Sequence, residues 1–367
     1  MDVPQAVPGV PALASISTRT SHVCGLTPAG EAWCWGENSL GQLGDGTSAP
    51  RANPVKVTGD LRFSQIAAGG GFTCAVALTG LAYCWGAGAL GQAGLELCGS
   101  VGTTPCAKSP LLVGARPVTA VAAGVRHACV IDSAGAAWCW GFNFLGEVGS
   151  TAYGENVVAP RRVSGANVYA SIGAGDSFTC AMTTAGSAWC WGAGGRGELG
   201  RAVPACNSVS VFTNTCSAVP VAVNTTAVFS TLSVGMSHSC ALTSAGVAHC
   251  WGDNGQGQLG TKDFVNPIDP VVAQGGMTFA SIGASLGTTC GTPSAGVTVC
   301  WGLNVFGELG IGTRQELSTT PLPTSGARRF SSFAGADYHY CALTADGATW
   351  CWGLGRGGEL GTGPLLP

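Results

Sequence analysis

The chain has little charge and very little lysine. Asp, Glu, Lys and Arg make up 10% of its 367 residues, the net charge is −3, and lysine occurs only three times. The basic residues form no stripe, which argues against a surface for nucleic acid or anionic membranes. The sequence has no run of eighteen apolar residues, so we expect no membrane insertion. The first residues lack the regions of a signal peptide, so a secreted protein would be in mature form with an added Met.

Motifs of catalysis and cofactor binding are also missing. The sequence contains no HExxH and no C-x-x-C, and its Gly-x-Gly runs are turn glycines of the repeat. The polar residues that could do chemistry instead recur with the repeat described below, which is typical of structural residues. These are His22, His127, His238 and His339, and the glutamates Glu147, Glu198, Glu308 and Glu359, which alternate with glutamine. We therefore predict a protein that is not an enzyme and binds no cofactor or metal.

Glycine and one glycine-rich motif are abundant. Glycine accounts for 59 residues, and the stretch WGENSLGQLG from Trp35 returns in six further copies. The copies begin at Trp85, Trp140, Trp191, Trp251, Trp301 and Trp352. A spacing of about 50 to 60 residues is typical of a propeller, solenoid or array, and the composition favours packed strands and turns. Four further tryptophans, Trp33, Trp138, Trp189 and Trp350, stand two residues before a repeat tryptophan, so we expect both sets to pack between neighbouring repeats.

The eighteen cysteines follow the same repeat. Fourteen form seven pairs with nine residues between the partners: Cys24 with Cys34, Cys74 with Cys84, Cys129 with Cys139, Cys180 with Cys190, Cys240 with Cys250, Cys290 with Cys300, and Cys341 with Cys351. A glycine turn lies between the partners of each pair, which predicts a hairpin with the cysteines opposed across it, at roughly 4.5 to 5.5 Å between Cα atoms. Seven cross-strand disulfides, one in each repeat, are therefore predicted.

The other four cysteines lie in insertions after two glycine-rich copies. Cys98 is predicted to pair with Cys106, and Cys206 with Cys216, so that each disulfide staples its own loop. Nine disulfides indicate an oxidising compartment, so we expect a secreted, periplasmic or cell-surface protein.

Each repeat predicts four short strands. A Pro-x-x-Val segment forms the outermost strand, as at Pro54, because proline is tolerated at a sheet edge. The last repeat lacks this strand, and PQAV at Pro4 can supply it, so we predict a ring closed by the N-terminal strand. The segment GPLLP at Pro364 is a weaker competitor for the same place. The predicted blades of this single domain are residues 13–58, 61–114, 116–164, 167–224, 227–274, 277–325, and 328–363 with 4–10.

The combined pattern xAGxxHxCALTxxGxxxCWGxNxxGQLG, followed by a Pro-x-x-Val strand, resembles the repeat of the regulator of chromosome condensation family. The resemblance covers essentially the whole chain, seven times, and it implies an all-β, seven-bladed β-propeller with four-stranded blades. It is less specific for function, since similar propellers serve as nucleotide-exchange factors on chromatin, a plant ultraviolet photoreceptor, ubiquitin-ligase modules and secreted bacterial enzyme inhibitors. The cysteine pair in each repeat and the mild acidity depart from the nuclear members, which argues against chromatin binding and GTPase exchange.

The places where the repeat varies suggest a binding surface. In a four-stranded blade, the turn between strands one and two and the loop between strands three and four open on the same face, so both insertions share a face with the turns before the histidine position. Arg19 replaces a usual glycine in one such turn. The candidate residues on this face are Arg19, Arg126, Asp176, Met236, Asp337 and Tyr338. Stapled loops on a rigid ring can present a binding surface, and tolerated surface insertions are an equal alternative.

The sequence therefore favours a non-enzymatic, extracytoplasmic propeller that recognises a protein or a glycan through the face bearing the two stapled loops. One alternative is a structural or self-assembling surface protein, and another is a secreted enzyme inhibitor. An enzyme or a GTPase exchange factor is the least favoured reading. Asn224 begins a glycosylation sequon, which carries information only if the host glycosylates.

Overall fold

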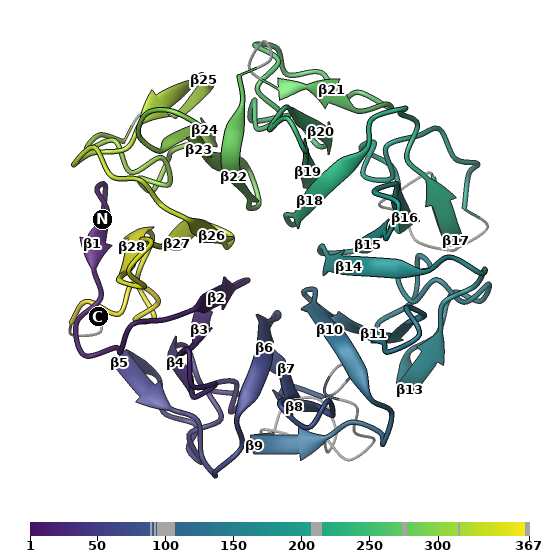
Figure 1. Cartoon of the computed structure of the whole chain (residues 1–367), viewed down its shortest axis with the longest axis horizontal. Helices are drawn as coiled ribbons and strands as arrows, with labels where there is room; N and C mark the ends of the chain where they lie inside the picture. Colours follow the sequence, from purple (N-terminus) through teal and green to yellow (C-terminus); the bar gives the residue numbers. More distant parts are fainter. Residues whose placement is uncertain are drawn as a thin grey trace.

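The chain folds into a ring of seven antiparallel, four-stranded blades, as the repeats predict (Figure 1). This computed structural model describes residues 1–88, 90, 91, 93, 107–206, 215–273, 277–314 and 316–363. In each blade the first strand lies nearest the ring axis and the last lies at the rim (Figure 1). We number the blades 1 to 7 from the N-terminus.

The strands of blades 1 to 4 follow the order expected from the repeat. Blade 1 contains β2 (Ser15–Thr18), β3 (His22–Leu26), β4 (Ala32–Gly36) and β5 (Arg51–Lys56). Blade 2 contains β6 (Phe63–Ala68), β7 (Phe72–Ala77), β8 (Ala82–Gly86) and β9 (Ala107–Leu112). Blade 3 contains β10 (Val118–Ala123), β11 (His127–Asp132), β12 (Ala137–Gly141) and β13 (Val157–Arg162). Blade 4 contains β14 (Tyr169–Ala174), β15 (Phe178–Thr183), β16 (Ala188–Ala193) and β17 (Cys216–Ala222).

The remaining blades keep the same strand order, and blades 5 and 7 have an unusual outermost strand. Blade 5 contains β18 (Phe229–Val234), β19 (His238–Thr243), β20 (Ala248–Gly252) and the short β21 (Val271–Val272). Blade 6 contains β22 (Phe279–Ala284), β23 (Thr288–Pro293), β24 (Val299–Leu303) and β25 (Leu317–Pro323). Blade 7 contains β26 (Ser332–Gly335), β27 (His339–Leu343) and β28 (Thr349–Gly353), and its fourth strand is β1 (Gln5–Ala6).

The N-terminal strand closes the ring. In β1, Gln5 lies opposite Cys351 and Ala6 lies opposite Trp350, and the backbone N–H of Val7 donates to Thr349 at 3.0 Å. The predicted closure by the PQAV segment is therefore confirmed. The competing segment at Pro364 lies outside the described residues. Joining both ends of the chain in one sheet leaves blade 7 as complete as the others.

The hairpin disulfides are present in every blade. All seven predicted pairs are bonded and lie directly opposed in the register of the second and third strands, with Cα atoms 4.1 Å apart. This distance is slightly shorter than the predicted 4.5 to 5.5 Å, because each bond draws its two strands together. The pairs are Cys24 with Cys34, Cys74 with Cys84, Cys129 with Cys139, Cys180 with Cys190, Cys240 with Cys250, Cys290 with Cys300, and Cys341 with Cys351. These fourteen cysteines are fully buried.

The two insertions differ in what the structure describes. Cys206 and Cys216 are bonded, as predicted for the insertion in blade 4. The predicted partners Cys98 and Cys106 of the insertion in blade 2 lie outside the described residues, so their pairing stays a prediction.

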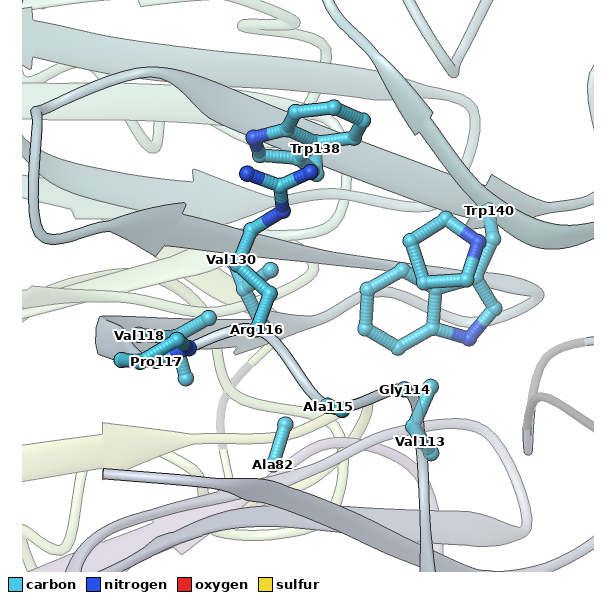
Figure 2. Close-up of a pocket in the computed structure, with 11 residues that line it drawn as sticks. Ala82, Val113, Gly114, Ala115, Arg116, Pro117, Val118, Val130, Trp138 and Trp140 are labelled. Carbon is cyan, nitrogen blue, oxygen red and sulfur yellow. The ribbon is translucent and has the colours of Figure 1, made fainter.

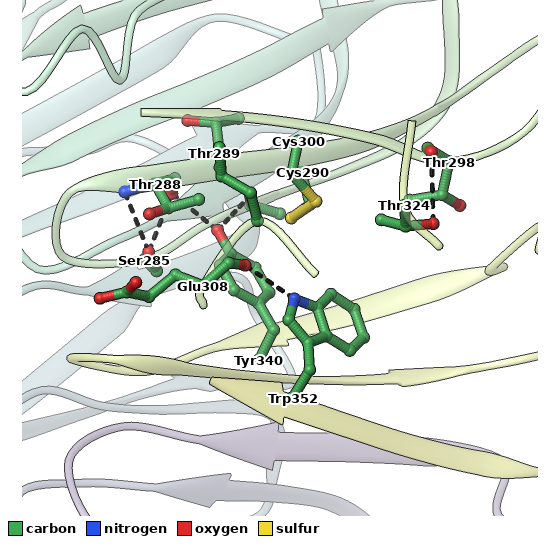
Figure 3. Close-up of a disulfide and its surroundings, with 12 residues drawn as sticks. Ser285, Thr288, Thr289, Cys290, Thr298, Cys300, Glu308, Thr324, Tyr340 and Trp352 are labelled. Atoms are coloured by element: carbon green, nitrogen blue, oxygen red, sulfur yellow. Dashed lines mark hydrogen bonds between the residues drawn. A yellow bond between two sulfur atoms is a disulfide. The ribbon is translucent and has the colours of Figure 1, made fainter. Parts of the chain in front are cut away.

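The core lies between the blades, where the seven repeat tryptophans are fully buried, as the sequence predicts. In six of them the indole Nε1 donates to the backbone carbonyl oxygen at the Gln/Glu position of the preceding blade, at 2.7–3.1 Å. The pairs are Trp35–Glu359, Trp85–Gln42, Trp191–Glu147, Trp251–Glu198, Trp301–Gln258 and Trp352–Glu308. Figure 3 shows the contact between blades 6 and 7, where Tyr340 also donates to the carbonyl oxygen of Thr288 at 2.6 Å. These contacts fix each blade against the next.

The recurring histidines join blades as well. Nε2 of His22 lies 2.8 Å from Oγ1 of Thr73 on the second strand of the next blade, and His127 and His238 make the same contact at 2.8 and 2.9 Å. His339 contacts Thr18 on the inner strand of blade 1 at 3.0 Å. Burial lowers the pKa of His22, His127 and His339 to about 3 and that of His238 to about 4, so all four are neutral near pH 7. Their role is structural, as their recurrence in the repeat indicates.

Candidate functional site: the loop face of the ring

One face of the ring, which we call the loop face, carries two sets of connections. The inner turns join the first and second strands of each blade, and the outer loops join the third and fourth. The two sets meet, because the N–H of Glu37 in an outer loop donates to the carbonyl oxygen of Ser21 in an inner turn at 2.8 Å. The disulfide between Cys206 and Cys216 lies in the outer loop of blade 4, so this insertion shares the face with the inner turns, as predicted.

The inner turns are tied together by backbone hydrogen bonds from blade to blade. Six such bonds of 3.0–3.3 Å run around the axis: Gly70–Gly124, Val125–Gly175, Asp176–Met236, Met236–Ser285, Leu286–Ala336 and Asp337–Arg19, each written donor first. The turns approach so closely that a Cβ atom on Gly124 would lie 2.5 Å from the carbonyl oxygen of Gly175. Glycine is needed there for space, and we call the inner edge that these turns form around the axis the inner rim.

Arg19 lies inside this rim and not on the open face. Its side chain is buried, and the guanidinium Nη2 donates to the carbonyl oxygens of Ala123 at 3.4 Å and of Ala174. These carbonyls end the inner strands of blades 3 and 4, so the side chain crosses the axis from blade 1. Arg19 was predicted among the residues of the binding face, and the structure shows that its side chain is buried. Blade 1 has arginine where four blades have glycine, and this longer side chain reaches across the axis to blades 3 and 4.

Two acidic residues, Asp337 and Asp176, act electrostatically on the buried guanidinium. Nε and Nη1 of Arg19 have no hydrogen-bond partner in the described part of the chain, and neither does the buried Oδ1 of Asp337. Burial lowers the pKa of Arg19 to about 10, while the charges of Asp337 and Asp176 act in the opposite direction. Burial raises the pKa of Asp337 to about 6, opposed by the positive charge of Arg19. Arg19 therefore remains a cation at neutral pH.

The structure places the other predicted residues around this rim, at least partly exposed. The guanidinium of Arg126 lies 3.9 Å from the carboxylate of Asp176 and stacks on the ring of Phe142 at 4.0 Å. Tyr338 packs edge-on against Phe306 of the neighbouring blade, with 5.1 Å between the ring centroids. Asp337 precedes Tyr338 in the chain. Met236 takes part in the backbone hydrogen bonds that join the inner turns. Only Arg126 and Asp176 form an ion pair with each other.

The outer loops expose apolar side chains that the sequence analysis missed. Seven large apolar residues of these loops are exposed in the described structure: Leu40, Phe144, Tyr153, Phe264, Val265, Ile268 and Val305. The connections on the opposite face expose four: Leu78, Val168, Val228 and Met277. Three of the seven lie within five residues of one loop in blade 5, where Phe264, Val265 and Ile268 are 52%, 67% and 56% exposed. The sequence FVNPI was the available signal, since such residues rarely cluster in a solvated loop without a partner.

Four outer loops are held in shape by a buried asparagine. Asn38, Asn143, Asn254 and Asn304 each accept a hydrogen bond from a backbone N–H five residues later at 3.0 Å and donate to carbonyl oxygens further along the loop at 2.9–3.1 Å. These residues are the N of the WGxN motif. Blades 2, 4 and 7 have glycine there instead, at Gly88, Gly194 and Gly355, and of these blades 2 and 4 carry the cysteine insertions. In blade 4 the N–H of Gly194 donates to the carbonyl oxygen of Thr215 at 3.0 Å, a backbone bond that Asn304 of blade 6 also makes, to Glu316 at 3.0 Å.

Metal-binding clusters and membrane-spanning helices are both absent from the described residues. No group of three or more His, Cys, Asp or Glu side chains among them could hold a metal ion. None of them belongs to a helix long and apolar enough to cross a membrane.

Comparison with protein families identifies the repeat. One model of the regulator of chromosome condensation (RCC1) repeat matches residues 29–76, and a second model of that repeat matches 63–92, 118–147, 169–198 and 229–258. The chain belongs to the RCC1 repeat family. The matches of the second model begin at or next to the first residue of an inner strand and end in the outer loop, so the RCC1 repeat and the structural blade share one period.

Several curated proteins are similar in sequence to this chain. It is similar to the ultraviolet-B receptor UVR8 of Arabidopsis thaliana, with 26% identity over 71% of this chain and 57% of the receptor. It is 28% identical to the mitochondrial RCC1 domain-containing protein RUG3 of Arabidopsis thaliana, over 67% of this chain and 55% of that protein. It is 30% identical to the probable E3 ubiquitin-protein ligase HERC4 of Homo sapiens, over 69% of this chain and 18% of the ligase. The chain thus spans little more than half of the first two relatives.

Solved structures share the propeller fold at low identity. Human WBSCR16 superposes with a TM-score of 0.78 at 17% identity, covering 96% of this chain and 88% of that one. Prp20p of Saccharomyces cerevisiae, described with its binding properties to Gsp1p and histones, gives 0.76 at 18% identity over 96% and 85%. The CRINKLY ectodomain of the receptor kinase ACR4 from Arabidopsis thaliana gives 0.58 at 21% identity over 96% and 99%. At these identities the likeness supports the fold alone.

Proposed function

We propose that this RCC1-repeat propeller is a non-enzymatic, extracytoplasmic binding protein that recognises a protein partner through its loop face. The observation that carries the proposal is the exposed apolar cluster of Phe264, Val265 and Ile268 on an outer loop held by Asn254. Apolar side chains on a rigid support lose little conformational entropy on binding, so their burial contributes to affinity with little cost.

The rest of the loop face fits such an interface. Aromatic and arginine side chains are the residues that most often dominate binding energy, and Arg126, Phe142 and Phe144 form one stacked group there. The ring centroids of Phe142 and Phe144 are 4.8 Å apart, and Phe144 is partly exposed. Exposed charges such as Arg126 and Asp176 would form the polar rim of the interface and set its specificity.

Two further considerations support the partner class and the compartment. The yeast relative by fold, Prp20p, is described with its binding to Gsp1p and histones, so a propeller of this architecture can bind proteins. The ACR4 propeller is an ectodomain, so the same fold also occurs outside the cell. The fully buried hairpin disulfides of this chain are consistent with folding in an oxidising compartment, which is why we propose an extracytoplasmic location.

The proposal is tested by affinity capture from the envelope and extracellular fraction of the source organism. The bait variants are the native chain, a loop-face variant (Phe264→Ser, Val265→Ser, Ile268→Ser), and a control variant that makes the same kind of change on the opposite face (Leu78→Ser, Val228→Ser). All five residues are exposed, so we expect the variants to remain folded. We expect one protein to be captured by the native chain and the control and to be lost with the loop-face variant.

Other outcomes would redirect the proposal. Capture that survives in the loop-face variant and disappears in the control would place the interface on the opposite face and contradict it. Capture abolished by periodate treatment of the fraction would identify a glycan as the ligand. Retention of only further copies of the chain would support a self-assembling structural protein instead.

A further inference from the structure

A pocket lies between blades 2 and 3, away from the loop face. It has a volume of about 470 Å³ and opens beside the connection that leads from β9 to β10. Figure 2 shows the side chains arranged around it. The lining is mainly apolar and includes Val113, Pro117, Val118, Val130, Trp138 and Pro160. This volume lies within the range of about 300–1,000 Å³ that is typical of sites for small molecules.

The pocket is found where one blade departs from the repeat. In five blades an aromatic residue stands at or just before the start of the inner strand, and its ring centroid lies 5.5–6.2 Å from that of the repeat tryptophan of the same blade. These residues are Phe63, Tyr169, Phe229, Phe279 and Phe330. Val118 occupies this position in blade 3. The equivalence is structural, since the N–H of Val118 donates to Gly80 at 2.7 Å just as that of Phe63 donates to Gly30 at 2.8 Å. The smaller side chain leaves the space that a ring fills elsewhere.

A fixed cationic group stands at the edge of this pocket. The guanidinium of Arg116 stacks on the ring of Trp138 at 3.8 Å, and Nη1 lies 3.6 Å from the carboxylate of Asp132. Asp132 also accepts a hydrogen bond from Nε1 of Trp138 at 2.9 Å, so it orients both partners. The side chain of Arg116 is half exposed, which leaves part of its planar N–H edge open to a ligand.

A second arginine adds positive charge on the same side. Arg162 lies directly opposite Trp138 in the register of β12 and β13. It is two residues from Pro160, which lines the pocket, so the two share a face of the strand. Arg116 and Arg162 outnumber Asp132, the acidic residue in contact with Trp138 and Arg116, so the pocket edge favours a negative charge.

We propose that this pocket binds a small monoanion with an apolar, ring-sized body, whose body occupies the space beside Val118 and whose anionic group pairs with Arg116. The apolar lining selects the body, and the guanidinium held by Trp138 and Asp132 selects the charge. Carboxylates and sulfonates share this chemistry, because both offer oxygens that match the planar N–H pair of arginine. This site is independent of the loop face and of any protein partner bound there.

Fluorescence titration with two matched probes tests the proposal. 1-Anilinonaphthalene-8-sulfonate carries an apolar ring body and one negative charge, and N-phenyl-1-naphthylamine has the same rings without the charge. We expect the native chain to bind the anionic probe with one site. Val118→Phe should abolish that site, because five other blades already accommodate a ring at this position. Arg116→Gln should weaken the affinity for the anionic probe by about tenfold and change the affinity for the neutral probe by less than about twofold.

Controls separate the pocket from general apolar binding. Val168→Phe adds the same ring at the exposed connection before blade 4, outside the pocket, and should leave binding unchanged. The loop-face variant with serine at 264, 265 and 268 should also bind normally, and phenylacetate should compete with the anionic probe. Thermal unfolding verifies that each variant is folded. The proposal is overturned if the native chain shows no saturable site, if Val118→Phe binds as tightly, or if Arg116→Gln weakens both probes equally.

Discussion

The guanidinium of Arg19 donates a hydrogen bond to the backbone carbonyl oxygen of Ala174, three blades away around the ring. The same group reaches the carbonyl oxygen of Ala123, so one side chain connects blade 1 with blades 3 and 4. All the other contacts between blades described above join immediate neighbours. The bond therefore braces the ring across its axis, at the end that carries the loop face.

Removing this brace should weaken the fold. Arg19→Ala leaves two buried carbonyl oxygens without their donor, and we expect the free energy of unfolding to fall by about 1–3 kcal/mol. It should also raise the pKa of Asp337 above about 6, because the positive charge of Arg19 opposes the effect of burial there. Urea denaturation measures the first effect and NMR titration of Asp337 the second. An unchanged pKa of Asp337 would contradict this description of the rim.

The path of Arg19 also marks the limit of what the sequence predicts. The spacing of the repeat tryptophans and cysteines was sufficient for the blades, the hairpin disulfides and the closure by the PQAV segment, because each depends on neighbouring strands. The partners of Arg19 lie more than 100 residues away and come within reach only when the ring has closed. The repeat indicates that Arg19 is unusual, but it does not indicate the direction of the side chain.

The apolar loops and the pocket were missed for a different reason. The repeat varies in its inner turns, which drew attention to them, and the pattern does not show which outer-loop residues remain exposed, as Phe264 and Val265 are. The change from an aromatic residue to Val118 is visible in an alignment of the seven copies. Its consequence depends on which ring the residue would have touched, and that contact appears only in the folded blade.

Glu147 should make stability depend on pH. It is fully buried, Oε2 accepts a hydrogen bond from the N–H of Leu145 at 2.8 Å, and burial raises its pKa to about 8. In the unfolded chain this carboxyl loses its proton near pH 4.5, whereas in the folded chain it keeps the proton until about pH 8. The unfolded state therefore binds fewer protons between these values, and the contribution of Glu147 to stability falls as the pH rises.

Glu147→Gln should remove this pH dependence, because glutamine keeps the shape and the acceptor and carries no charge. We expect unchanged stability near pH 4.5 and a gain on the order of a few kcal/mol at pH 8, measured by urea denaturation at both pH values. The reciprocal change Gln42→Glu, at the same position of blade 1, should destabilise at pH 8 and not near pH 4.5. An equal effect of Glu147→Gln at both pH values would mean that charge is not its cause.

The disulfides should differ in their resistance to reduction. The fourteen hairpin cysteines are fully buried, whereas Cys206 of the blade 4 insertion is partly exposed. Under a mild reductant at neutral pH, we expect alkylation at Cys206 and Cys216 more than about tenfold faster than at the hairpin pairs, which react only when a blade opens. Peptide mass spectrometry over time measures the order. Alkylation of the native, unreduced protein would contradict full oxidation, and the peptide with Cys98 and Cys106 tests that predicted pair.

Asn254 should contribute both to the stability of the ring and to its affinity for a partner. Its side chain accepts from the N–H of Leu259 at 3.0 Å and donates to Thr261 at 3.0 Å and to the carbonyl oxygen of Val265 at 3.1 Å. Asn254→Ala removes these bonds and leaves their backbone partners buried without it. We expect the free energy of unfolding to fall by about 1–3 kcal/mol. The loop that presents Phe264 then loses its fixed shape, so affinity for the partner should fall as well.

Asn224 provides the matched control, because it lies in the connection after β17 and makes one exposed hydrogen bond, to Asp269 at 2.9 Å. Asn224→Ala should change stability by less than about 0.5 kcal/mol and leave partner affinity unchanged. The decisive comparison is between Asn254→Ala and the serine variant of the loop face. If the apolar side chains act through the shape that Asn254 gives their loop, both variants lose affinity but only Asn254→Ala loses stability. Full affinity in a folded Asn254→Ala would mean that the partner does not require that shape.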